Sequence, residues 1–211
     1  DKLLIVSGAE REKLLHDAID TLFNVYDAVN ADGVRAELDR KGILYTLPSN
    51  YVEERFREFY DALIKTNLGA LPKNIIKTIK DAQTHVIANL QSGDKIVPWD
   101  YSPRNIIVET GIIIPIDHED YKQASPIVPV MALLQNPENR ITTEAREVFV
   151  AHAVDGFEER GIVITEKAAD AARILYDVRR ARTLANSILG GNSGVGKTIE
   201  WYINDIKEAM R

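Results

Sequence analysis

Apolar residues recur at intervals of three and four over most of this 211-residue chain, a pattern typical of helices that bury one face. Near the N-terminus, for example, Leu15, Ile19, Leu22 and Tyr26 fall on one side of a predicted helix. Seven further segments carry a comparable pattern. We therefore predict helices over residues 10–29, 34–41, 52–66, 72–90, 127–135, 143–160, 166–189 and 195–210.

One central segment, from about residue 94 to residue 117, departs from this helical period and is rich in Ile and Val. Its two apolar runs, 106–108 and 112–116, flank Thr110 and Gly111, which is typical of a hairpin with a tight turn. A further short strand is predicted at residues 3–6. The predicted fold class is therefore mainly α with a small β-hairpin insert, an α+β arrangement.

Composition narrows the possible functions. Hydrophobic residues make up 45% of the chain, enough for a sizeable core in one domain or at most two, and the net charge of -6 argues against a general nucleic-acid binder. The absence of cysteine excludes disulfides, thiol catalysis and sulfur-ligated metals. No apolar run approaches the length of about 20 residues that spans a bilayer. We expect a soluble cytoplasmic protein with neither nucleic acid nor membrane as a partner.

Candidate chemistry lies at the edges of the predicted hairpin. Asp100 and Asn105 bracket a tight loop before the first strand, and Asp117 ends the second strand. If the strands pair, the three polar side chains can converge at the rim. An Asp, an Asn and a second Asp suit magnesium-dependent phosphoryl transfer, because one carboxylate orients the attacking hydroxyl while two oxygen donors hold the metal.

The motif around these residues resembles a known family. The sequence reads PWDYSPRN over 98–105, then an apolar run, then IDHE over 116–119. This resembles the motif of the C-terminal lobe in the aminoglycoside phosphotransferase and choline kinase group, the small-molecule branch of the protein-kinase-like fold. By this resemblance residues 1–211 form a single C-terminal lobe, with a hinge strand at about 3–6, a catalytic hairpin at about 95–119 and a helical remainder.

The resemblance also implies an activity. Asp100 would be the catalytic base, and Asn105 and Asp117 would bind Mg²⁺ and, through it, ATP. The γ-phosphate would pass to the hydroxyl of a small-molecule acceptor. The nucleotide-binding N-terminal lobe, roughly 80 to 100 residues before the hinge, would be missing or supplied separately, so we expect little or no kinase activity from this chain alone.

Two departures from the family pattern favour a second interpretation, a degenerate kinase-like scaffold without catalysis. Pro98 stands where the family has a His that helps to hold the loop. Residues 126–132 contain no carboxylate where the family often has an anchoring Asp. A plainer role for Asp100 and Asn105 is to cap the loop by side-chain hydrogen bonds, with Asp117 as an exposed strand end.

Two other patterns have simpler interpretations. Residues 191–198 read GNSGVGKT, which fits the phosphate-loop pattern and leaves a nucleotide hydrolase centred on Lys197 as a third hypothesis. A helical pattern precedes this motif where the phosphate loop needs a strand, so we interpret it as a glycine-rich link between helices. Four arginines, at 173, 179, 180 and 182, make the preceding helix locally basic, which is typical of a solvated face.

Overall fold

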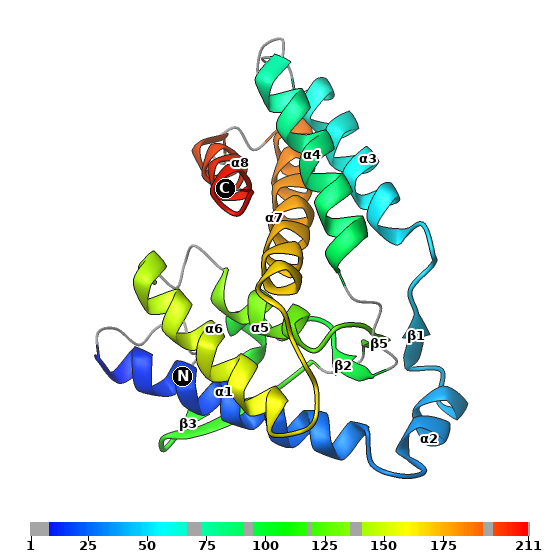
Figure 1. Ribbon diagram of the computed structural model, residues 1–211, viewed down its shortest axis with the longest axis vertical. Helices are drawn as coiled ribbons and strands as arrows, with labels where there is room; N and C mark the ends of the chain where they lie inside the picture. The colour runs from blue at the N-terminus through cyan, green and yellow to red at the C-terminus, as the bar shows by residue number, and fades with distance from the viewer. Residues whose placement is uncertain are drawn as a thin grey trace. The chain divides into compact units, whose positions relative to one another are not determined.

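The computed structural model describes residues 9–66, 73–90, 95–117, 120–135, 141–191 and 196–210. The chain divides into two compact units (Figure 1). Unit 1 comprises residues 1–47 and 91–165, and unit 2 comprises residues 48–90 and 166–211. The chain therefore leaves unit 1 at residue 47, forms two helices of unit 2, returns at residue 91 and leaves again after residue 165.

Every predicted helix is present, and its ends lie within a few residues of the prediction. Unit 2 is helical in its described residues, and unit 1 combines helices with short strands. The helices of unit 2 are α3 (Tyr51–Lys65), α4 (Lys73–Asn89), α7 (Glu166–Leu189) and α8 (Gly196–Glu208). Those of unit 1 are α1 (Ala9–Val29), α2 (Val34–Arg40), α5 (Ile127–Leu134) and α6 (Thr143–Glu158). Among the described helices, none combines the length and the apolar character that a bilayer crossing requires.

The strands of unit 1 form two small sheets. The predicted hairpin is confirmed: β3 (Ile106–Glu109) pairs antiparallel with β4 (Ile112–Pro115). Its turn uses positive φ at Thr110 and Gly111, a conformation that glycine adopts without steric cost. A three-stranded sheet was not predicted; in it β5 (Tyr121–Gln123) lies between β1 (Leu44–Thr46), which is parallel to it, and β2 (Ile96–Pro98), which is antiparallel. The hinge strand predicted at residues 3–6 lies outside the described residues.

Helix α1 is joined to β2 through Asn30, the residue that follows the helix. The Asn30 side chain accepts a hydrogen bond from the Ile96 backbone N–H at 2.9 Å and donates one to the Ile96 carbonyl at 2.8 Å. A side-chain amide that satisfies both backbone groups of one strand residue acts as an additional strand at that point. The end of α1 therefore fixes where β2 begins, only a few residues before the candidate loop.

Aromatic rings fill the contact between α1 and α6. The Phe23 ring of α1 packs edge-on against Phe157 of α6, with ring centroids 5.1 Å apart. The guanidinium of Arg160 lies 4.6 Å from the centre of the Phe23 ring and also pairs with Asp27 of α1 at 3.0 Å. A stacked cation and a perpendicular ring both favour one ring position, so Phe23 is held from two sides.

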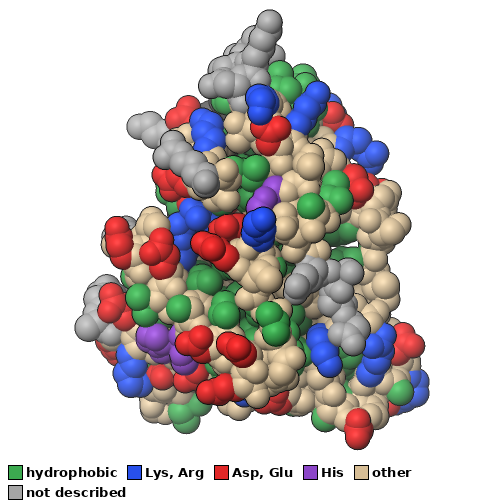
Figure 2. Space-filling view, viewed as in Figure 1, with side chains coloured by type: hydrophobic (Ala, Val, Ile, Leu, Met, Phe, Trp, Pro, Cys, Tyr) green, Lys and Arg blue, Asp and Glu red, His purple; other side chains and the backbone are tan. Residues whose placement is uncertain are grey.

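A small polar cluster lies over the same two helices, where Figure 2 shows histidine side chains beside acidic ones. The rings of His16 and His152 are 4.9 Å apart, and His152 Nε2 lies 2.8 Å from a carboxylate oxygen of Asp20. The contact between α1 and α6 therefore has an aromatic interior and an ionic outer edge.

In unit 2, α7 is buried on nearly all sides over residues 168–178, mostly through alanines and larger aliphatic residues, and α3, α4 and α8 pack on it. Arg173 of α7 makes a bidentate bond to Asp205 of α8, at 2.7 Å and 2.5 Å, and its side chain is only 13% exposed. Arg182 pairs with Glu58 of α3. The prediction that these arginines form a solvated face is therefore wrong for both, because acids on neighbouring helices bind them.

Gly156 gives a test of the α1–α6 contact. An alanine Cβ at this position of α6 would lie closer to the Phe23 ring than van der Waals contact allows. Alanine normally favours a helix over glycine by about 1 kcal/mol, but overpacking of this kind costs about 1–3 kcal/mol. We expect Gly156→Ala to lower the free energy of unfolding, measured by urea denaturation, and a second change, Phe23→Leu, to recover part of the loss. Equal stability of Gly156→Ala and the wild type would contradict the packing described.

Candidate functional site

The candidate loop begins where β2 ends. Trp99 follows β2; its side chain is 3% exposed, and its backbone N–H donates to the Asp120 carbonyl at 2.9 Å. This bond continues the pairing between β2 and β5 by one step. Asp100 comes next, and its side chain is exposed. The loop therefore leaves the sheet with its first residue buried and its second turned to solvent.

Asn105 closes the loop through three hydrogen bonds. Its side-chain Nδ2 donates to the Asp100 carbonyl at 3.0 Å, and its backbone N–H donates to the Ser102 carbonyl at 2.9 Å. Its own carbonyl accepts from the Ile116 backbone N–H at 2.8 Å. Of the capping role predicted for the side chains of Asp100 and Asn105, the part of Asn105 is present, and the same residue connects the loop to the end of the hairpin.

Asp117 is placed by the hairpin register. Because Ile106 pairs with Pro115, the bond between Asn105 and Ile116 continues the ladder, and Asp117 follows directly. Asp117 is exposed, and its φ of 61° is left-handed, which is uncommon for a residue with a Cβ and often marks a functional site. The neighbouring His118 and Glu119, part of the motif, lie outside the described residues.

The backbone thus brings together the three segments that carry the predicted site residues. Among the described residues, nothing donates a hydrogen bond to Asn105 Oδ1, and no hydrogen bond or ion pair engages the carboxylates of Asp100 and Asp117. Nor does any group of three His, Cys, Asp or Glu side chains in that part of the chain form a metal cage.

Sequence reasoning missed a cation beside this loop. Lys122 of β5 lies with its ammonium 2.5 Å from a carboxylate oxygen of Asp120. The same ammonium is 5.5 Å from the centre of the Trp99 ring and 5.1 Å from that of Tyr45, and the side chain is 15% exposed. This largely enclosed ammonium packs on Trp99, the residue before Asp100. No sequence pattern pointed to it, because the pairing of β5 with β2 was not predicted.

The two departures from the family motif have plain structural counterparts. Pro98 is the last residue of β2 and is buried. Helix α5, which contains most of the segment without a carboxylate, is apolar and buried along its whole length. Neither position supplies a polar side chain to the loop, so other residues hold it in place.

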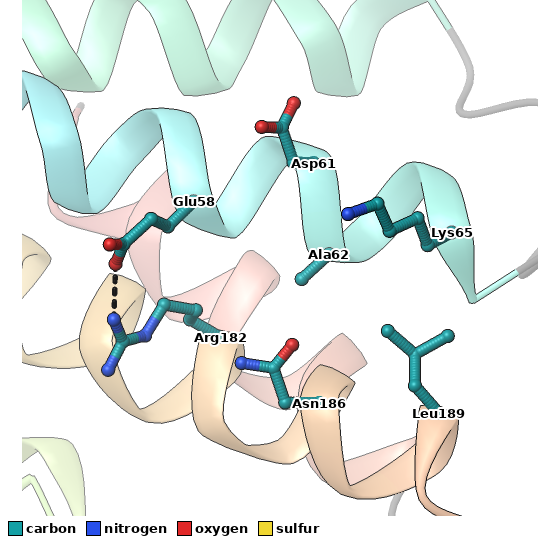
Figure 3. Close-up of a pocket in the computed structure, with 7 residues that line it drawn as sticks. All are labelled: Glu58, Asp61, Ala62, Lys65, Arg182, Asn186 and Leu189. Carbon is teal, nitrogen blue, oxygen red and sulfur yellow. Dashed lines mark hydrogen bonds and ion pairs between the residues drawn. The ribbon is translucent and has the colours of Figure 1, made fainter.

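A hollow of about 300 Å³ in unit 2 is a second candidate (Figure 3). It lies between α3 and α7, and Glu58 and Arg182 form an ion pair across one end of it. Glu58 also pairs with Arg55 at 3.0 Å. Seven residues line it: Glu58, Asp61, Ala62, Lys65, Arg182, Asn186 and Leu189. The lining contains two acidic and two basic side chains. One of each, Glu58 and Arg182, already forms an ion pair that joins α3 to α7, so this pair has a structural role.

The phosphate-loop pattern over 191–198 lacks the structural context that it needs. The residues before it form α7, which is a helix where a phosphate loop follows a strand. Residues 192–195 lie outside the described residues, and Lys197 falls in the first turn of α8. Because a helix precedes the motif, we interpret the motif as a link between α7 and α8. The hypothesis of a nucleotide hydrolase loses its main support.

Comparisons with known proteins identify the fold. No protein-family model matches the sequence, and no curated protein is similar to it in sequence. Among solved structures, choline kinase LicA from Streptococcus pneumoniae is similar with a TM-score of 0.53 and 18% identity, over 74% of this chain and 54% of that chain. An ADP-bound aminoglycoside phosphotransferase, APH(2'')-Ib, gives a TM-score of 0.49 and 16% identity, over 99% of this chain and 66% of that one.

The chain therefore has the protein-kinase-like fold of the small-molecule kinases, as the motif predicted. It spans about half the length of the choline kinase that it resembles. At this level of identity the likeness establishes the architecture, and the chemistry has to be argued from the residues of this chain.

The left-handed backbone of Asp117 can be tested with two substitutions that both remove the carboxylate. Glycine adopts a positive φ freely, whereas the Cβ of alanine costs about 1 kcal/mol or more in that conformation. We expect Asp117→Gly to be more stable than Asp117→Ala by about 1 kcal/mol in urea denaturation.

Val148, which is 60% exposed on α6, provides the matched control. In a helix, alanine is more stabilising than glycine by about 1 kcal/mol. The free energy of unfolding of Val148→Ala should therefore be higher than that of Val148→Gly. The same order at both positions would show that Asp117 does not hold a left-handed conformation in solution.

Proposed function

We propose that this chain is the catalytic lobe of a phosphotransferase that moves the γ-phosphate of ATP to the hydroxyl of a small molecule. The observation that carries the proposal is the position of Asn105, which is bonded both to the loop of Asp100 and to the residue before Asp117. The protein-kinase-like fold supports the same proposal, since it is the architecture in which such a loop and strand end are used together.

Each residue would have a separate role. Asp100, whose carboxylate is exposed and unengaged among the described residues, would orient the acceptor hydroxyl and accept its proton. Asn105 would offer Oδ1, because its Nδ2 is already committed to the Asp100 carbonyl. Asp117 would offer its carboxylate from the end of the hairpin. Asp100 would thus handle the proton, while Asn105 and Asp117 would hold the metal.

The donor set fits Mg²⁺ bound together with a nucleotide. Asn105 and Asp117 would hold the ion, and the phosphates and water would complete its coordination. When bound, Mg²⁺ offsets the negative charge that develops on the phosphate oxygens during transfer. The N-terminal lobe that covers the nucleotide in this family would be a further partner, whether it precedes Asp1 or comes from another chain.

A binding module without catalysis is the alternative, and one observation favours it. Pro98 and the apolar helix α5 leave the loop without the two polar supports that the family uses. A loop that is held less firmly can still bind a nucleotide while it fails to align the acceptor hydroxyl, because transfer demands closer positioning than binding does.

Asp100→Asn separates transfer from binding. If Asp100 is the base, the substitution should lower the rate of ATP-dependent phosphorylation by roughly 10²- to 10⁴-fold and leave Mg²⁺–ADP affinity nearly unchanged. The rate would be measured on the chain together with its nucleotide-binding lobe. Glu109→Gln, an exposed acid at the hairpin turn, is the matched control and should have no effect. An unaltered rate in Asp100→Asn would end this assignment.

Asp117→Ala tests the metal ligands without any turnover. We expect Mg²⁺–ADP to bind by isothermal titration calorimetry, and Asp117→Ala to weaken it by roughly tenfold or more, since even the partners of metal ligands contribute that much. Titration of ADP with EDTA should show little binding to either protein. Binding that is equally strong in the wild type and Asp117→Ala would place the nucleotide elsewhere.

A further inference from the structure

The loop from Trp99 to Asn105 needs a firm attachment if it is to present Asp100 and Asn105 accurately. Reactive side chains generally have to be held to within about half an ångström of a productive position. Here the residue before the loop is a buried proline, and α5 offers only apolar side chains. The attachment therefore has to come from a residue that the family motif does not specify.

Tyr101 is such a residue. It stands between the exposed Asp100 and the buried Ser102, and its own side chain is fully buried. Its hydroxyl donates a hydrogen bond to the carbonyl of Ala18, in the middle of α1, at 2.7 Å. Ala18 is itself fully buried, so this bond connects the loop directly to the interior of unit 1.

Two properties make this bond a reliable anchor. Burial raises the pKa of the Tyr101 hydroxyl, so it remains a protonated donor over the whole physiological range of pH. The acceptor belongs to a helix that Asn30 also bonds to β2, so one rigid element holds both the strand that leads into the loop and the loop itself. A displacement of the loop would break this bond and leave a buried hydroxyl without its acceptor, which costs about 1–3 kcal/mol.

We propose that Tyr101 is a positioning residue: its bond to the Ala18 carbonyl holds the loop and thereby places Asp100 and Asn105. The anchoring is a property of the fold, and its consequence for catalysis rests on the proposed phosphotransferase function. Lys122, which packs on Trp99, supports the start of the same loop from the opposite strand.

The test uses Tyr101→Phe, which removes one hydroxyl and keeps the ring. We expect the variant to fold, because one buried hydrogen bond contributes only about 1 kcal/mol of the roughly 5–15 kcal/mol of a typical domain. Amide exchange, followed by NMR, reports on the backbone N–H groups of Asn105 and Ile116, which are bonded to Ser102 and Asn105. Both should exchange about fivefold faster in the variant, the factor that corresponds to one such bond.

The Ile96 amide, bonded to Asn30 in the same unit, is the internal reference. A bond that merely stabilised unit 1 would speed exchange at Ile96, Asn105 and Ile116 alike, whereas a loop anchor changes only the last two. Tyr202→Phe, at a buried tyrosine of unit 2, is the matched variant and should leave all three unchanged. Equal acceleration at all three amides, or none at Asn105 and Ile116, would overturn the proposal.

The kinetic consequence is measured with the nucleotide-binding lobe present. Tyr101→Phe should lower kcat and also raise KM for ATP, because the displaced loop carries both the proposed base, Asp100, and one of the two proposed metal ligands, Asn105. Faster exchange with an unchanged kcat would reduce Tyr101 to a structural residue and overturn its positioning role. If the wild-type protein neither binds nor uses ATP, the proposed function fails, and amide exchange alone decides whether Tyr101 anchors the loop.

Discussion

The candidate site depends on the hydrogen bonds of one residue, Asn105. Its side-chain nitrogen closes the loop, its N–H tightens the turn, and its carbonyl receives the end of the hairpin. Because these three groups belong to one residue, the loop cannot open without loosening the end of β4. The chemistry proposed for Asp100 and Asp117 requires this coupling, since the two acids are 17 positions apart in the chain and share no regular element.

The surroundings of this residue reinforce the same arrangement. Helix α1 contributes an amide at its end, which fixes β2, and a carbonyl at its middle, which receives the Tyr101 hydroxyl. Strand β5 contributes Lys122, whose ammonium packs on Trp99. None of these contacts uses the position of the family His or the family Asp. This loop is therefore held by contacts that the family motif does not specify, and these contacts involve α1 and β5, elements packed in unit 1.

Much of the architecture could be predicted from the sequence, because long amphipathic helices repeat their signal many times. The hairpin was also predictable, since two Ile-rich runs flank a residue pair suited to a turn. The strands β1, β2 and β5 contain three residues each, too few to show alternation, so their pairing could not be inferred. For the same reason the position of Lys122 was missed. The ion pairs of Arg173 and Arg182 were missed because they depend on which helices become neighbours.

Each of the two units contains one of the chain's two tryptophans, so each unit has its own intrinsic fluorophore. Trp99 lies in unit 1 and is enclosed beneath a lysine, whereas Trp201 lies in unit 2 and is 39% exposed. An indole in an apolar enclosure fluoresces at shorter wavelength than one in contact with water. The emission spectrum of the native protein is thus the sum of a contribution from a buried indole and one from a partly exposed indole. The blue component originates one residue away from Asp100 and so provides an intrinsic optical probe of the loop.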